Sequence, residues 1–264
     1  MMFFFHIKGE GEPVLFLHGF TGSSGTWDGM EKLLPFQLIM PDLAGHGQTT
    51  RLSANLEAEA EALKQMMDKI GFTAFHLVGY SMGGRLALAL ALLHPEAVRS
   101  LVLESTSPGL QNEQERAARR SSDEKLAQKI EKGGIASFVD FWENIPMFDS
   151  QKALSVPIRE TIRSERLKQS IEGLASSLRQ MGTGRQPSYW DRLSGLNMPV
   201  LLLTGTKDKK FTGIARQMSE LIPFCEWIEF DEAGHAIHVE QRGKFGTIVK
   251  TFLSNIKGGK EDGS

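Results

Sequence analysis

The feature that most constrains the fold is the stretch at residues 77–85, Leu-Val-Gly-Tyr-Ser-Met-Gly-Gly-Arg. Apolar residues lead into a Gly-x-Ser-x-Gly turn, and a run rich in alanine and leucine follows from Arg85 to Leu93. This order predicts a strand, a sharp turn and a helix, with the Ser81 hydroxyl held clear of the backbone. A chance match to the pattern would need neither the strand nor the helix, so the context favours a nucleophile elbow.

Short apolar runs elsewhere predict further strands, and segments with helical periodicity lie between them. The predicted strands cover residues 3–8, 14–17, 36–42, 74–78, 98–103, 200–203 and 226–230, and the predicted helices cover residues 27–34, 57–70, 85–93, 211–222 and 239–256. Strands that alternate with helices favour a mostly parallel sheet with helices on both faces. The predicted fold class is therefore α/β.

Residues 112–190 interrupt this alternation. The segment has helical stretches, frequent arginines and several aromatic residues, but no convincing buried strand. Because a structureless loop of this length is uncommon, we predict a helical lid inserted between two strands. The predicted α/β core then comprises residues 1–111 and 191–256. Residues 257–264, rich in glycine and charge, are predicted to form a disordered tail.

Composition and charge exclude several classes of protein. A formal net charge of -2 argues against a nucleic-acid binder held by overall charge. The single cysteine, Cys225, allows no internal disulfide and no cysteine-rich metal site. The chain has no apolar run of ~18 residues that could span a membrane, and its N-terminus does not resemble a signal peptide. We therefore expect a cytoplasmic protein that acts on a small molecule, with a monomer as the default state.

Ser81 has two predicted partners late in the chain. The α/β-hydrolase order is serine, then acid, then histidine, and Ser81, Asp208 and His235 fit it. His235 would take the serine proton, and Asp208 would fix the tautomer of the imidazole. The alternatives to Asp208 are Asp231 and Glu232, which lie nearer His235 in sequence, but Asp208 is favoured because it follows a strand.

Two backbone N–H groups are predicted to stabilise an oxyanion next to Ser81. They belong to Phe20, in the loop after the second predicted strand, and to Met82, directly after the serine. Three further histidines are not assigned as bases. His18 and His46 are predicted to be structural or oxyanion-loop residues, and His238 to begin a helix. The histidines and aspartates show no metal-ligand spacing.

Arg85 is unexpected beside an ordinary esterase elbow. It lies one turn after Ser81 on the same face of the predicted helix. A cation in the first turn opposes the helix dipole, at a cost of up to ~1 kcal/mol. An anion bound at Ser81 would remove that cost and accept a charge-assisted hydrogen bond. An ion pair between Arg85 and a nearby carboxylate of the protein would explain the position of the arginine equally well.

Several longer motifs are more selective than the elbow. They are Gly-Tyr-Ser-Met-Gly-Gly-Arg at 79–85, Glu-Ser-Thr-Ser-Pro-Gly-Leu-Gln-Asn at 104–112, Glu-Arg-Ala-Ala-Arg at 115–119 leading to Asp123, Phe141-Trp142 with Pro146, Arg-Ser-Glu-Arg at 163–166, and Gly-Thr-Gly-Arg-Gln-Pro at 182–187. On these motifs, and over nearly its whole length, the chain resembles the 2-succinyl-6-hydroxy-2,4-cyclohexadiene-1-carboxylate synthases. These are lyases with an α/β-hydrolase fold.

The resemblance implies an enzyme of menaquinone biosynthesis that uses no metal or organic cofactor. It would eliminate pyruvate from 2-succinyl-5-enolpyruvyl-6-hydroxy-3-cyclohexene-1-carboxylate. The site that the resemblance implies has a catalytic triad of Ser81, Asp208 and His235, a basic pocket of Arg85, Arg119 and Arg166, and a lining that includes Tyr80 and Trp142. Arg163, one turn before Arg166, is an alternative to it. Three arginines suit a substrate with three carboxylates.

The hypothesis from the sequence is that Ser81, activated by His235, acts as a base on the ring proton next to the succinyl ketone. No acyl-enzyme is required. A carboxylesterase or carbon–carbon bond hydrolase of the same fold is the main rival, because it would need the triad but not the three arginines. A ligand receptor would need a defective triad, and a pure interaction protein would leave the elbow unexplained.

Overall fold

The computed structural model describes residues 3–256. The strands are β1 (Phe5–Lys8), β2 (Pro13–Leu17), β3 (Gln37–Pro41), β4 (Phe75–Tyr80), β5 (Val98–Glu104), β6 (Val200–Gly205) and β7 (Cys225–Phe230). The α-helices are α1 (Leu56–Lys69), α2 (Met82–Leu93), α3 (Glu113–Trp142), α4 (Val156–Leu167), α5 (Ile171–Met181), α6 (Lys209–Leu221), α7 (Ile237–Glu240) and α8 (Arg242–Asn255). Short 3₁₀ helices cover Ser24–Trp27, Met30–Lys32, Pro95–Ala97, Pro146–Ala153 and Trp190–Gly195.

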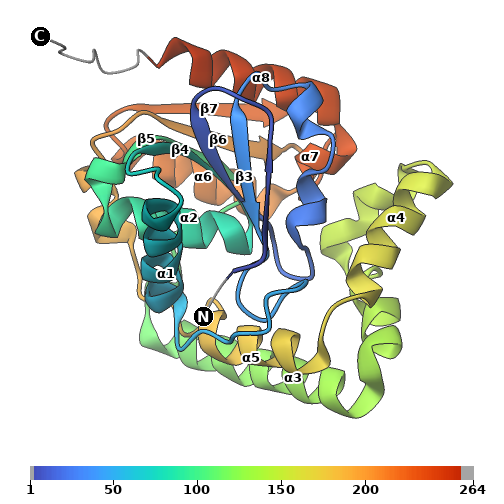
Figure 1. Cartoon of the computed structure of the whole chain (residues 1–264). Coiled ribbons are helices and arrows are strands. Elements are labelled where there is room, and N and C mark those ends of the chain that lie inside the picture. The colour runs from blue at the N-terminus through green and yellow to red at the C-terminus, as the bar shows by residue number, and fades with distance from the viewer. Residues whose placement is uncertain (1–2, 257–264) are drawn as a thin grey trace, which may run out of the picture.

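The strands form one sheet in the order β1-β3-β2-β4-β5-β6-β7. Only β1 runs antiparallel to its neighbour; the other pairs are parallel. Helices α1, α2 and α6 cover one face, and α8 covers the other (Figure 1). This arrangement confirms the predicted α/β class and the mostly parallel sheet. It also directs the carboxyl ends of β2, β4, β5, β6 and β7 to one edge.

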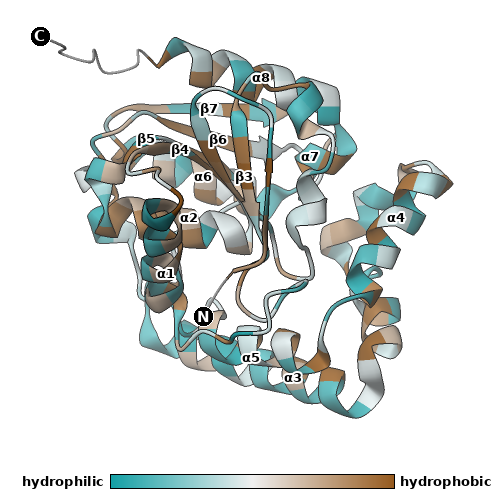
Figure 2. Cartoon of the chain, viewed as in Figure 1, coloured by the Kyte–Doolittle hydropathy of each residue, from teal (hydrophilic) through white to brown (hydrophobic). Residues whose placement is uncertain are grey.

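The central strands are apolar on both faces, because helices cover both sides of the sheet. In β2, Leu15 and Leu17 pack toward α1 and α2, whereas Val14 and Phe16 pack toward α8. The strands are accordingly hydrophobic along their length, while the outer faces of the helices are hydrophilic (Figure 2). This continuous burial explains why the strands were predictable from short apolar runs.

The segment between β5 and β6 contains α3, α4 and α5 and has a small core of its own. Ala127, Ile130 and Phe138 of α3 are buried against Leu174 and Leu178 of α5. The structure assigns no strand to residues 112–190, all of which it describes. In Figure 1 α3 and α5 run together along one side of the molecule, and α4 stands beside the core. We call residues 112–190 the helical insertion.

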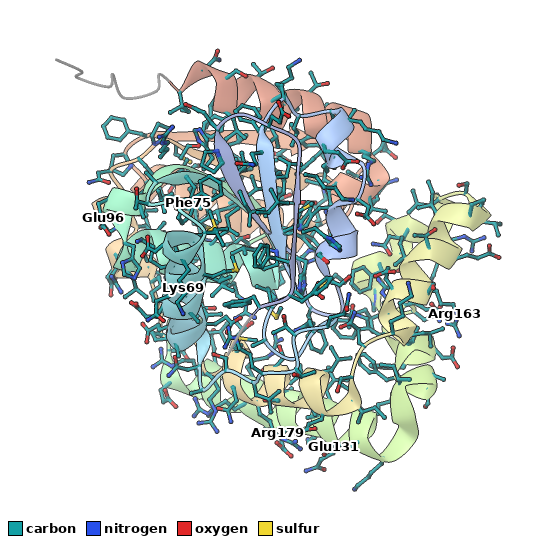
Figure 3. All side chains as sticks on the ribbon, viewed as in Figure 1. Lys69, Phe75, Glu96, Glu131, Arg163 and Arg179 are labelled. Carbon is teal, nitrogen blue, oxygen red and sulfur yellow. The ribbon has the colours of Figure 1, made fainter. Side chains whose placement is uncertain are left out.

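Two features hold or bend the helical insertion. Arg179 of α5 pairs with Glu124 and Glu131 of α3, and Figure 3 shows Arg179 and Glu131 together at the outer surface.

Gly134 has φ +77°, so it interrupts the long helix α3. A residue with a side chain would adopt that backbone angle at a cost. The bend sets the direction of the last turns of α3, which carry Trp142.

Two predicted helices differ from the structure. The predicted helix at residues 27–34 is not continuous: one 3₁₀ helix ends at Trp27 and another begins at Met30. Between them Gly29 has φ +83°, which is incompatible with a continuous helix. The last predicted helix is divided into α7 and α8 at Gln241, which has φ -135° and ψ 52°. The predicted disordered tail, residues 257–264, lies outside the described residues. Among residues 3–256, no helix is long and apolar enough to cross a membrane.

Gly83 allows α2 to approach the sheet closely, and its replacement should destabilise the protein strongly. A Cβ at this position would overlap the backbone carbonyl oxygens of Leu17 and His18, which cannot turn away as a side chain could. We expect Gly83→Ala to lower the free energy of unfolding by about 3 kcal/mol or more.

Gly213, in the middle of α6, is the matched control, because no atom lies within 4 Å of a Cβ built there. Gly213→Ala should raise the free energy of unfolding by about 0.5–1 kcal/mol. Urea unfolding of both variants checks the pair. Wild-type stability of Gly83→Ala would show that α2 does not need this close approach.

Candidate active site

Ser81 lies on a strained turn between β4 and α2. Its φ of +51° is unusual for a residue with a side chain. The turn is held on both sides: Ser81 N–H donates to the Glu104 carbonyl at 2.9 Å, and Arg85 N–H donates to the Ser81 carbonyl at 3.0 Å. Gly79 has no room for a side chain, because a Cβ would lie 2.7 Å from the Cα of Gly84. The turn leaves the Ser81 hydroxyl facing a cavity.

The structure brings Ser81, His235 and Asp208 into one hydrogen-bonded chain. His235 Nε2 lies 2.9 Å from Ser81 Oγ, and His235 Nδ1 lies 2.6 Å from Asp208 Oδ2. Because a carboxylate only accepts, Nδ1–H donates to Asp208 and leaves Nε2 to accept the Ser81 proton. Asp208 is also the N-cap residue of α6, and its Oδ1 lies 3.4 Å from the backbone nitrogen of Phe211.

The two alternative acids lie elsewhere. Asp231 accepts hydrogen bonds from Thr206 and from the N–H of Glu232. The Glu232 carboxylate pairs with Lys207 at 2.8 Å. Neither carboxylate is hydrogen-bonded to His235, so Asp208 is the acid that contacts the imidazole.

A cavity of about 590 Å³ opens in front of Ser81, between the core and the helical insertion. Of the residues singled out by sequence, it is lined by Phe20, Ser81, Met82, Arg85, Arg119 and Trp142. The N–H groups of Phe20 and Met82 accordingly belong to residues at the cavity wall. Within residues 3–256 no acceptor is hydrogen-bonded to either N–H group. Met82 is also the first residue of α2, where the helix dipole favours negative charge.

Arg85 reaches from α2 toward the helical insertion. Its Nη1 donates to the Met181 carbonyl at 2.8 Å and to Gln186 Oε1 at 2.9 Å. Burial, together with the nearby charge of Arg119, lowers the pKa of Arg85 to about 10, so it remains a cation at neutral pH. In the described part of the chain Arg85 forms no ion pair with a carboxylate, although the charge of Asp123 acts to raise its pKa. The side chain is therefore a partly buried cation that has no carboxylate in contact with it.

Arg119 is more exposed than Arg85 and has a partner. Its Nε donates to Asp123 Oδ1 at 2.7 Å, and 41% of its side chain remains accessible. Burial raises the pKa of Asp123, and Arg119 partly opposes this. The cavity wall thus contains the cations Arg85, Arg119 and Lys210 against the carboxylates of Glu115 and Asp123.

Arg166 and Tyr80 line a second, adjacent cavity of about 300 Å³, which shares Phe20 with the first. Arg166 is only 6% exposed, and burial lowers its pKa. Its guanidinium carbon lies 4.6 Å above the ring of Phe148, and its Nη2 lies 3.4 Å from Gln151 Oε1. The predicted basic pocket is therefore divided between two neighbouring cavities.

Arg163 is placed differently from Arg166. It pairs with Asp140 and Glu143, both at 2.5 Å, and Figure 3 shows it on the outer side of the insertion. These pairs raise the pKa of Arg163 and satisfy its charge at the surface. Of the two alternatives, only Arg166 lines the cavity that contains Tyr80.

Sequence reasoning missed several residues around His235. Phe211 lies 4.7 Å from the imidazole between ring centroids, and Phe148 lies 6.3 Å from it. Gln186, the side-chain partner of Arg85, falls inside a motif noted in the sequence but was given no role. His238 is a buried residue bound to Glu104 rather than simply the start of a helix. These contacts join distant segments, so no local pattern reveals them.

His18 and His46 support the loop that carries Phe20. His18 Nδ1–H donates to the Gly19 carbonyl at 2.8 Å, and its Nε2 accepts the N–H of Leu43 at 3.0 Å. Burial lowers the pKa of His18 to about 4 and that of His46 to about 3. Both histidines are therefore neutral at pH 7, and their ring nitrogens form hydrogen bonds to backbone groups of the surrounding loops.

The lowered pKa of His18 predicts acid sensitivity. Its folded-state pKa of about 4 lies below the ordinary value of 6.5, so below pH 6.5 the unfolded state binds the extra proton. Stability should fall between pH 6.5 and 4 with a slope of about 1.4 kcal/mol per pH unit from this residue. We expect His18→Gln to be less stable at pH 7 but to lose that part of the slope. Urea unfolding of wild type and of His18→Gln at pH 5 and 6 gives the change of stability with pH for each protein. Equal changes in the two proteins would rule out His18 as the source of the acid sensitivity.

Among the described residues, no group of three or more histidines, cysteines, aspartates and glutamates is arranged to hold a metal ion. The groups that converge on the cavity are instead a hydroxyl hydrogen-bonded to a histidine, two backbone N–H groups and arginines. Such a set can move a proton, stabilise an oxyanion and hold carboxylates.

Comparisons with known proteins agree with this geometry. Residues 12–241 match the family model for the alpha/beta hydrolase fold. The chain is 44% identical over 252 residues to the putative 2-succinyl-6-hydroxy-2,4-cyclohexadiene-1-carboxylate synthase of Bacillus subtilis (strain 168), covering 93% of this chain and 91% of that protein. It is 33% identical to the synthase of Salmonella heidelberg (strain SL476), covering 89% and 92%.

A solved structure of MenH from S. aureus superposes with a TM-score of 0.92 at 35% identity, covering 96% of this chain and 99% of that chain. The predicted resemblance and the α/β-hydrolase fold are thereby confirmed. The chain belongs to the 2-succinyl-6-hydroxy-2,4-cyclohexadiene-1-carboxylate synthase family of α/β-hydrolase-fold proteins.

Proposed function

We propose that this chain is a carbon–oxygen lyase of menaquinone biosynthesis. It eliminates pyruvate from 2-succinyl-5-enolpyruvyl-6-hydroxy-3-cyclohexene-1-carboxylate to give 2-succinyl-6-hydroxy-2,4-cyclohexadiene-1-carboxylate. The observation that carries the proposal is the position of Arg85, a partly buried cation without a contacting carboxylate, in the same cavity as Ser81. The family membership agrees with it.

In this proposal Ser81, Asp208 and His235 act as a proton-transfer unit. Nε2 of His235, 2.9 Å from Ser81 Oγ, accepts the serine proton. Asp208, 2.6 Å from Nδ1, stabilises the imidazolium that forms. The activated Ser81 oxygen, directly or as a relay to His235, takes the proton from the ring carbon next to the succinyl ketone. Serine is then a base, and no bond to the substrate is formed.

The remaining steps balance without an external reactant. Electrons from the broken C–H bond shift through the ring as its double bonds rearrange, and the C–O bond to the enolpyruvyl group breaks. The departing enolate of pyruvate takes up one proton, so the net products are pyruvate and the cyclohexadiene. The negative charge that develops on the succinyl ketone oxygen is stabilised by the N–H groups of Phe20 and Met82.

The arginines hold the carboxylates of the substrate. Arg85 and Arg119 line the cavity that contains Ser81, whereas Arg166 lines the adjacent cavity beside Tyr80. Trp142, whose ring centroid lies 5.4 Å from that of Phe20, closes the cavity on the side of the insertion. A charge-assisted contact from a buried arginine is worth more than one at an exposed site.

We also propose that the helical insertion, residues 112–190, is the lid of this site. It supplies Arg119 and Trp142 to the cavity wall and accepts both hydrogen bonds from Arg85. A lid that covers Ser81 would exclude water from the proton transfer. We place the reaction, on a water-soluble polyanion, in the cytoplasm.

Release of pyruvate from the enolpyruvyl substrate tests the function. The purified protein should release one pyruvate per substrate, and neutral acyl esters should be turned over far more slowly. The main rival, a carboxylesterase or carbon–carbon bond hydrolase, predicts the reverse. No pyruvate release together with fast ester hydrolysis would refute the proposal.

A further inference from the structure

Glu104, the last residue of β5, contacts both segments that carry the proton-transfer unit. Its backbone carbonyl accepts the N–H of Ser81 at 2.9 Å. Its carboxylate accepts the N–H of His238 at 3.1 Å and the Nδ1–H of the same residue at 2.9 Å. One residue thus joins the elbow to the segment that begins α7, three residues beyond His235.

The Glu104 carboxylate depends on His238 for its hydrogen bonds. The Glu104 side chain is 0% exposed and that of His238 is 2% exposed. No lysine or arginine in the described residues forms an ion pair with Glu104. A buried carboxylate without donors is strongly unfavourable, so the two bonds from His238 fix this segment firmly. Nδ1 lies 2.9 Å from both carboxylate oxygens, which restricts the rotation of the ring.

Aromatic packing carries this constraint to His235. The ring of Tyr80 lies 4.6 Å from that of His238 and 5.4 Å from that of His235 between centroids. The ring of Trp27 also packs against that of His238, with 4.8 Å between centroids. Tyr80 directly precedes Ser81 and packs closely against the backbone of Gly19, where an added Cβ would lie 2.6 Å from the Cε1 of Tyr80. A displacement of His238 would therefore move Tyr80 and, with it, the imidazole of His235.

We propose that Glu104 and His238 are positioning residues, which hold Ser81 and His235 at hydrogen-bonding distance without touching the substrate. The inference rests on the proposed function, since it assigns the pair to the same reaction. It gives a role to the glutamate that begins the motif at 104–112. Because proton transfer depends steeply on the donor–acceptor distance, the pair should affect kcat more than KM.

Two substitutions of His238 separate positioning from direct contact. The amide nitrogen of His238→Asn can occupy the place of Nδ1 and still donate to Glu104. His238→Gln instead carries its amide to the place of Nε2 and leaves the carboxylate with one donor fewer. Both replacements are polar and similar in size to histidine, so both should fold.

For pyruvate elimination we expect His238→Gln to lower kcat by about 10- to 100-fold with KM within about 3-fold of wild type. His238→Asn should stay within about 3-fold in kcat. Thermal unfolding of both variants confirms that they are folded. A folded His238→Gln with wild-type kcat would overturn the proposal. Equal losses in the two variants would also overturn it, because they would point to Nε2 rather than to the bond with Glu104.

A spectroscopic measurement tests the same inference without the substrate. The His235 Nδ1 proton shared with Asp208 should give a low-field proton NMR signal. The signal should be at its wild-type position in His238→Asn and shifted or broadened in His238→Gln. An unchanged signal in His238→Gln would contradict positioning. If wild type released no pyruvate, the proposed function would fail while this test could still be read.

Discussion

Ser81→Ala should lower kcat for pyruvate elimination by about 10²–10⁴-fold, the range for loss of a general base. The substitution removes the hydroxyl that lies 2.9 Å from His235 Nε2 and faces the cavity. The arginines remain in place, so KM should change much less than kcat. A coupled assay of pyruvate, run under saturating substrate, gives the ratio directly.

The matched control is Ser24→Ala, because Ser24 is buried and lines neither of the two cavities. Its backbone N–H, which donates to Asp42 at 2.6 Å, is retained in the variant. Its kcat should equal that of wild type. Ser81→Ala should unfold at nearly the wild-type temperature, because alanine adopts the positive φ at a cost similar to that for serine. Near-wild-type kcat in a folded Ser81→Ala would exclude Ser81 from the proton transfer.

Arg85→Ala should lower kcat/KM for the enolpyruvyl substrate by about 10²–10³-fold. Loss of a desolvated charge partner of a carboxylate typically costs 2–5 kcal/mol, and about 1.4 kcal/mol corresponds to a factor of ten. The same change removes the hydrogen bonds to Met181 and Gln186 that tie α2 to the helical insertion. The kcat/KM of Arg85→Lys should lie between those of wild type and Arg85→Ala, since lysine keeps the charge but not the bidentate geometry.

Two comparisons make the Arg85 result specific. Arg119→Ala should cost less than Arg85→Ala, because Arg119 is 41% exposed and already paired with Asp123. Any slow hydrolysis of a neutral acyl ester should be nearly unaffected by Arg85→Ala, because such a substrate has no carboxylate to bind. A parallel loss on both substrates would mean that Arg85 supports the structure rather than the polyanion.

Local patterns were sufficient to predict the sheet and the position of the elbow. Each central strand is an uninterrupted apolar run because helices cover both of its faces, and the Gly-x-Ser-x-Gly turn has few structural alternatives. Asp208 and His235 were identified because each follows a strand, and parallel strands bring their carboxyl ends to one edge. The structure places both beside Ser81.

Contacts between distant segments could not be predicted in this way. The Arg85 guanidinium is hydrogen-bonded to Gln186, which is 101 residues later in the sequence. Glu104 is hydrogen-bonded to His238, which is 134 residues later. Nothing in either local sequence identifies the partner. The division of the arginines between two cavities likewise depends on how α4 stands beside the core, which is a property of tertiary packing. The break at Gln241 lies within a run whose apolar periodicity alone predicts a single helix.

The central claim is that Ser81 acts as a base and forms no bond to the substrate. A single turnover with enzyme in excess, quenched in acid and followed by intact mass spectrometry, tests it most directly. One pyruvate should be released per substrate while the mass of the protein stays that of the free chain throughout the reaction. A transient, stoichiometric increase in mass that maps to Ser81 would show an acyl-enzyme and contradict the claim.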